Sequence, residues 1–312
     1  MQLRPLSLGE LLDRAVTLCV RHALTFALIF LVFIVPFMIV QAFALPDQTA
    51  ALNQLVDMVR SGGKVIPRAG TDASAPALTF VWLGVFWLFS SLSYAALIVA
   101  TSRAYLEGSA SFAAAYRLAL RFWPRLIALT LLYVLAAAVV LMAASIIGVV
   151  ILAIAMLLSR ALVPLGIIFG VIVGGAFALA VIALALVAMI AGYLMCYALV
   201  LEGASIAGAF VRGLQRAFGR GNLLRSLGAG LALAAVSFGF TILVMVVTFA
   251  LLGIFHSALV GQLLGALVQA PVIAFFFAFL TLFYYDLRVR NEGFDLRVDA
   301  AAPAPVSAAL ID

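Results

Sequence analysis

Charged residues are scarce in this sequence. Asp, Glu, Lys and Arg make up 10% of the 312 residues, whereas apolar residues make up 67%. Soluble domains have about 25% charged and about 45–50% apolar residues. A soluble domain of this length would need a polar surface that the chain does not have. A water-soluble globular protein is therefore excluded, and a lipid bilayer must surround most of the chain.

Groups that carry chemistry are also few. The chain has two His, two Cys and twelve Asp and Glu residues. His22 and His256 lack partners at metal-ligand or catalytic-triad spacing, and Cys19 and Cys196 form no disulfide framework. Phosphate-loop, zinc-protease and serine-hydrolase motifs are absent. We therefore expect a protein that is not an enzyme and that uses no cofactor or metal.

Six long apolar runs dominate what is present. They cover residues 23–45, 78–100, 126–158, 162–200, 227–252 and 258–285. A chain in hydrocarbon must satisfy its backbone amides internally, so runs of this length predict helices. We predict an all-α, polytopic integral membrane protein with six transmembrane helices in one domain, residues 1–298. The Ala- and Pro-rich segment 299–312 is predicted to be a disordered tail.

The third and fourth runs are too long for an upright span. Their 33 and 39 residues give helices of about 50–58 Å, against a hydrocarbon core of about 30 Å. Pro164, Gly170 and Gly174 allow a broken or re-entrant start to the fourth run. A tilted hairpin with an extramembrane turn at Ser159 and Arg160 is the favoured alternative.

The distribution of Lys and Arg predicts the orientation. With the N-terminus inside and six spans, fourteen of these residues lie on the inner side, and the outer side has Arg60, Lys64, Arg68 and Arg160. By the positive-inside rule, both termini are cytoplasmic. Because the Arg residues border apolar runs, the basic pI near 9.7 indicates membrane orientation and not nucleic-acid binding.

Polar positions recur along the chain. Four pairs share an offset of 95: Glu107 and Glu202, Gly108 and Gly203, Arg117 and Arg212, and Arg121 and Arg216. A weaker third copy has Ser7 and Arg14 at the separation of Ser205 and Arg212. We infer three units, each an amphipathic interfacial helix followed by a hairpin of two spans.

The repeated residues are the candidate site. Arg117 and Arg121, like Arg212 and Arg216, are four residues apart and share a helix face, opposite large apolar side chains. We expect these four arginines to contact the headgroups of membrane lipids, anionic ones in particular, or a protein partner. Glu107 and Glu202 are candidate interfacial carboxylates, stabilised by the next helix N-terminus or used to bind a substrate.

Two terminal segments carry a resemblance to a known family. Residues 4–14 read RPLSLGELLDR, and residues 284–296 read YYDLRVRNEGFDL. With the repeated Leu-Glu-Gly, they resemble the bacterial membrane domain that is fused to some glycerophosphoryl diester phosphodiesterases and also occurs alone. The hydrolase domain, with its His-Arg-Gly start, has no counterpart in the sequence. The resemblance therefore implies a multi-pass module of the bacterial inner (plasma) membrane, without phosphodiesterase activity.

Two functions from different classes fit these features. The first is a non-enzymatic membrane module that organises lipid or a protein partner at the cytoplasmic face. The alternative is a permease or channel for a small solute or lipid, using the Gly-rich fourth span. No acid lies at the centre of a predicted span, which argues against ion-coupled transport. A continuous polar cavity would favour the alternative, and a sealed apolar bundle would favour the first.

Overall fold

The computed structural model describes residues 4–44, 75–219, 221–255 and 258–293. These residues form helices and short connections, without strands. The elements are α1 (Leu8–Arg21), α2 (Ala23–Ala44), α4 (Ala75–Glu107), α5 (Phe112–Ala161), α6 (Val163–Phe169), the π-helical η1 (Gly170–Gly174), α7 (Gly175–Glu202), α8 (Ile206–Phe218), α9 (Leu223–Phe255) and α10 (Ala258–Glu292). The all-α class is therefore confirmed, and six helical segments are long and apolar enough to cross a membrane.

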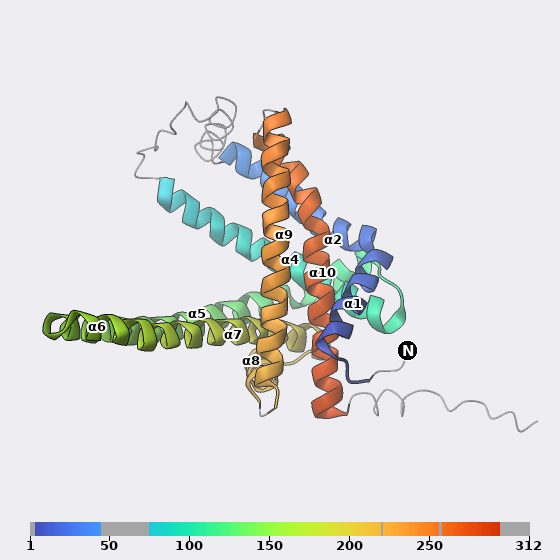
Figure 1. Cartoon of the computed structure of the whole chain (residues 1–312). Helices are drawn as coiled ribbons and strands as arrows, with labels where there is room; N and C mark the ends of the chain where they lie inside the picture. Colours follow the sequence, from blue (N-terminus) through green and yellow to red (C-terminus); the bar gives the residue numbers. More distant parts are fainter. Residues whose placement is uncertain (1–3, 45–74, 220, 256–257, 294–312) are drawn as a thin grey trace, which may run out of the picture.

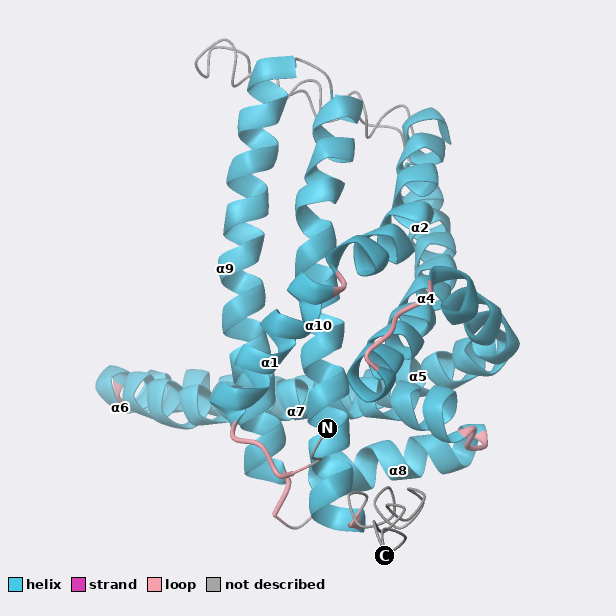
Figure 2. Cartoon of the chain, turned by 90° about the vertical axis from the view of Figure 1, so that its right-hand side faces the viewer, coloured by secondary structure: helices cyan, strands magenta, loops and turns pink. Residues whose placement is uncertain are grey.

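α10 lies at the centre of the fold. It packs against α1, α2, α4, α7 and α9, and α9 runs alongside it (Figure 1). Several of the largest buried side chains come from its second half and from α7, including Phe277, Phe283, Tyr284 and Tyr197. Figure 2 shows α8 lying across one end of this bundle.

α5 and α7 form a long hairpin that projects sideways from α9 and α10 (Figure 1). α5 alone has 50 residues, or about 75 Å of helix, well beyond a hydrocarbon core of about 30 Å. Its most apolar window has no buried residue, and apolar side chains are exposed along both arms. The hairpin therefore matches a bilayer only if it is strongly tilted.

The tip of the hairpin turns at Leu162, next to the predicted turn at Ser159 and Arg160. Gly166 makes this turn possible, because a Cβ there would lie 2.5 Å from the Cβ of Ser159. Pro164 sits in the first turn of α6, where its missing N–H costs no hydrogen bond. The π-helical segment then leads directly into α7, so the fourth run has no re-entrant break.

The repeated residues have matching local structure at several points. Gly108 and Gly203 each follow a helix end with positive φ, 70° and 64°, a conformation that favours glycine. Ser7 and Ser205 both cap a helix N-terminus, accepting hydrogen bonds from the amides of Glu10 and Gly208. These local features recur, and the grouping into three units remains a prediction.

The second unit corrects the expectation of a separate interfacial helix. α1 and α8 are separate helices, but Arg117 and Arg121 lie in the first turns of α5, which continues through Pro124 to Ala161. α8 ends instead at a break around Gly219 and Gly221, which has a φ of 87°. The α5 segment has no such glycine break. Residues 45–74, which include the predicted outer residues Arg60, Lys64 and Arg68, and the predicted tail 299–312 lie outside the described residues.

Candidate functional site

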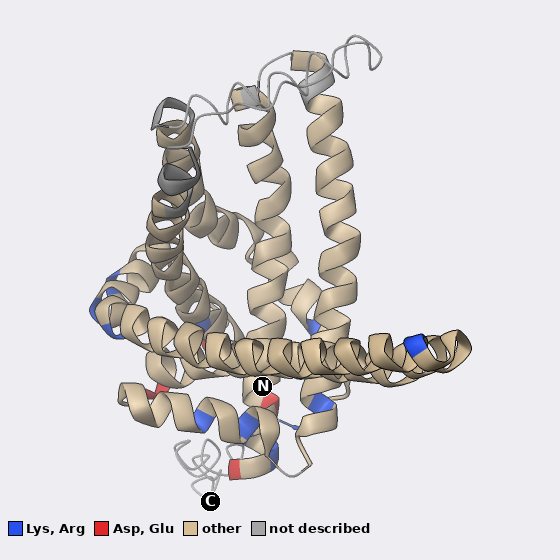
Figure 3. Ribbon diagram, turned by 90° about the vertical axis from the view of Figure 1, so that its left-hand side faces the viewer, with Lys and Arg blue, Asp and Glu red and all other residues tan. Residues whose placement is uncertain are grey.

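Charged residues gather at one end of the bundle. Figure 3 shows Lys and Arg mainly around α8, the start of α5 and the ends of α9 and α10 that lie near them, with one at the hairpin tip. The same end holds a pocket of about 750 Å³, lined by the ends of α7 and α10, by α8 and by the connection from α8 to α9. This pocket combines charged and amide side chains and is the candidate site.

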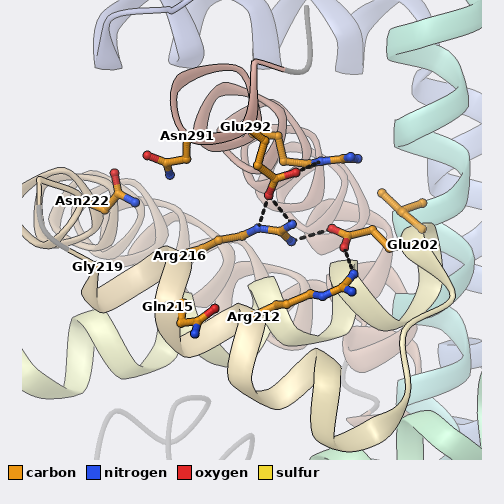
Figure 4. A pocket seen from close by; sticks show the side chains of 10 residues that line it. Glu202, Arg212, Gln215, Arg216, Gly219, Asn222, Asn291 and Glu292 are labelled. Carbon is orange, nitrogen blue, oxygen red and sulfur yellow. Dashed lines mark hydrogen bonds and ion pairs between the residues drawn. The ribbon is translucent and has the colours of Figure 1, made fainter. Parts of the chain in front are cut away.

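Glu202 lies at the centre of the pocket's charged network. It is the last residue of α7, and Gly203 turns the chain so that α8 packs back against α7. The Nη1 atoms of Arg212 and Arg216 each donate to a different carboxylate oxygen of Glu202, both at 2.6 Å (Figure 4). The hydroxyl of Tyr284, from α10, donates to the same carboxylate. One carboxylate therefore joins three helices.

Arg216 extends this network to the end of α10. Its Nη2 atom lies 2.5 Å from a carboxylate oxygen of Glu292, and Arg288 donates to the other oxygen of Glu292 at 3.1 Å. We call Glu202, Arg212, Arg216, Tyr284, Arg288 and Glu292 the Glu202 network. Burial alone lowers the pKa of Arg216, but hydrogen bonding to Glu202 and Glu292 outweighs it and raises the pKa. The guanidinium therefore stays charged.

The arginines that pair with Glu202 differ in solvent exposure. The side chain of Arg216 is 9% exposed and that of Glu202 is 10% exposed, whereas that of Arg212 is 50% exposed. A nearly buried ion pair stays stable only when its hydrogen bonds are satisfied, so Arg216 holds the helices together. Arg212, Gln215, Asn222 and Asn291 offer polar groups to the pocket.

A second network fixes the N-terminal segment. Asp286, on α10, has a fully buried side chain that accepts from the backbone N–H of Leu6 at 2.7 Å. Arg225 and Arg290 donate to Asp286 at 2.8 Å and 3.2 Å, and both also donate to the carbonyl oxygen of Leu6. We call these four residues the Asp286 network. The carboxylate of Asp286 therefore joins α10 to α9 and to the N-terminal segment.

Arg117 and Arg121 lie elsewhere. Together with Arg125 they are exposed and share one side of α5, which we call the arginine face of α5. Its three residues make no ion pair within the part of the chain that the structure describes. The opposite side packs on protein, since Tyr116 donates to the carbonyl of Ile29 at 2.7 Å.

The two repeated glutamates also differ. Glu107 is exposed and has no ion-pair partner among the described residues, whereas Glu202 bridges two arginines and a tyrosine. The structure therefore brings together Glu202, Arg212 and Arg216 and leaves Glu107, Arg117 and Arg121 apart from them.

Sequence reasoning missed the contributions of the last helix. Tyr284, Asp286, Arg288 and Glu292 all belong to the two networks. The scarcity of acids could have indicated these ion pairs. The chain has twelve acids and eighteen bases, so most acids that lie near arginines are expected to pair with them. The choice of partner depends on helix packing, which the sequence pattern does not contain.

Comparison with protein-family models, with curated proteins and with solved structures gives no match.

Proposed function

We propose that the protein is a non-enzymatic module of the bacterial inner membrane, with both termini cytoplasmic, that organises anionic lipid at the cytoplasmic face. The observation that carries this proposal is the arginine face of α5, whose exposed charges have no ion-pair partner among the described residues. Such charges attract anionic headgroups. The resemblance to the phosphodiesterase-associated membrane domain agrees with this proposal and remains a prediction, as do the three units.

The gathering of charge at one end supports the orientation. The start of α5, the second half of α8, the start of α9 and the end of α10 carry most described Arg residues and lie toward the same end, which is the cytoplasmic side by the positive-inside rule. The Glu202 and Asp286 networks hold the helices together at this end. They therefore stabilise the part of the fold that carries the arginine face of α5. Arg212 adds a half-exposed charge nearby on α8.

The described cavities support a module over a permease. The polar pocket lies at one end of the bundle, where charged residues gather. A smaller cavity between the spans is lined by residues without charge. A permease for a polar solute needs polar groups along a path between the two sides, and the wall of this smaller cavity, which has no charged residue, does not supply them.

The test uses the double substitution Arg117→Gln and Arg121→Gln. Each cation near an anionic surface contributes about 1 kcal/mol, so we expect roughly tenfold or greater loss of preference for phosphatidylglycerol over phosphatidylcholine at low salt. The measurement is the lipid composition that co-purifies from nanodiscs containing both lipids. Raising the salt should reduce the parent's preference as well.

Arg160→Gln is the matched control, because it removes a charge at the hairpin tip, far along α5 from the arginine face. It should leave the lipid preference unchanged. An unchanged preference in the folded, correctly inserted double variant would contradict the proposal and leave these arginines as determinants of orientation alone.

A further inference from the structure

A second cavity, of about 300 Å³, lies between α4, α5 and α7 and is closed on one side by Phe277 of α10. All its lining residues belong to helices that can cross a membrane, and none is charged. Burying an unpaired charge in such a place is very unfavourable. A ligand of this cavity is therefore neutral.

Aromatic rings form much of the wall: Trp87, Tyr94, Tyr133, Tyr193 and Phe277. The ring centroids of Tyr94 and Phe277 are 5.2 Å apart, and Tyr193 meets Phe277 edge-on at 6.1 Å. Aromatic walls favour offset or edge contacts with another ring. The volume is at the lower end of the range for small-molecule sites, so one planar ring system fits better than a bulky headgroup.

Most hydroxyl groups in the wall already have acceptors. Those of Ser90, Ser91, Thr130 and Tyr133 donate to backbone carbonyls of their own or a neighbouring helix. The hydroxyl of Tyr193 makes no hydrogen bond within the described residues. A donor in apolar surroundings gains from an acceptor on a ligand.

The cavity opens toward the lipid-facing surface of the hairpin. Val134 on α5 is 49% exposed and Ala185 on α7 is also exposed, yet both line the cavity. Both lie within apolar spans, so a molecule dissolved in the bilayer reaches this opening without crossing water.

We propose that this cavity binds a neutral, membrane-soluble molecule of the quinone class, with its planar ring against the aromatic wall and a carbonyl oxygen accepting a hydrogen bond from Tyr193. The site is separate from the arginine face of α5 and does not depend on the proposed lipid-organising function.

The experiment is tryptophan fluorescence quenching with menadione as the probe, on the purified full chain in detergent. Trp87 lines the cavity, so binding should give saturable quenching that Trp87→Phe largely removes. Tyr193→Phe removes the hydroxyl that donates to the ligand carbonyl in this proposal and should weaken binding about fivefold, the effect of losing one neutral hydrogen bond.

Ala185→Phe places a ring at the cavity opening and should weaken binding at least tenfold. Ala178→Phe is its matched control, because Ala178 is exposed on the same face two turns earlier and does not line the cavity. Both positions are exposed, so both variants should fold. The control should bind menadione like the parent.

Two results would overturn the proposal. One is quenching that does not saturate, or that is equal in the Ala185→Phe and Ala178→Phe variants. The other is strong quenching of Trp87 by phosphatidylcholine with brominated chains that menadione does not relieve, because a lipid chain then occupies the cavity.

Discussion

Replacing Glu202 with Gln removes the charge that Arg212 and Arg216 share, whereas the same change at Glu107 alters an exposed carboxylate. Breaking a buried ion pair by removing one partner costs about 3–5 kcal/mol. The side chain of Glu202 is 10% exposed, Gln keeps one acceptor oxygen, and Arg216 keeps Glu292. We therefore expect a smaller loss, about 2–3 kcal/mol of unfolding free energy.

The assay is thermal unfolding in detergent, followed by circular dichroism. A loss of this size should lower the melting temperature by about 5–10 °C, and Glu107→Gln should lower it by less than about 2 °C. Tyr284→Phe, which removes only the hydroxyl donor to Glu202, should fall between them. Equal melting temperatures for the two Gln variants would refute the assignment of Glu202 as the centre of the network.

Asp286→Asn should cost about 3–5 kcal/mol, because it leaves the arginines of its network without a counter-charge, and limited proteolysis should then cleave before residue 8 faster than in the parent. Ile206→Cys, with the native cysteines replaced by Ser, should react with a membrane-impermeant maleimide only after the inner face is opened; labelling of intact cells would contradict the topology. The pKa of Glu10 is lowered, first by the hydrogen bond from the backbone N–H of Ser7, so its contribution to capping α1 is present above the unfolded pKa and is lost as the pH falls through the folded value. The protection factors of the amides in the first turn of α1, which correct for the intrinsic pH dependence of exchange, should fall as the pH is lowered through the folded pKa, and this fall should be absent in Glu10→Gln.

The helical class and the local turns follow directly from the sequence. The apolar runs allow only helices in a bilayer, and Gly108 and Gly203 mark helix ends with the positive φ that glycine favours. Ser205 similarly predicts the start of α8. These features depend on residues that are close together in the sequence, so they can be predicted from it.

The sequence does not predict that equivalent residues of the repeat differ in burial and in ion pairing. Arg121 and Arg216 occupy equivalent positions at the offset of 95, yet Arg216 is covered by α10 and paired with Glu292, whereas Arg121 is exposed. The difference arises because α8 ends at a glycine break and folds over the end of α7, while α5 continues as one helix. Which helix covers a given face is decided by tertiary packing.

The contact between Leu6 and Asp286 sets an order of events during biosynthesis. The two residues are 280 positions apart, so at about 5–20 residues per second the N-terminal segment exists for roughly 14–56 s before its partner is made. During that interval α1 has no anchor on α10, and its amphipathic surface can rest on the membrane. Docking of Leu6 thus awaits the arrival of the last helix, and a ribosome that stalls before residue 286 leaves the N-terminal segment undocked.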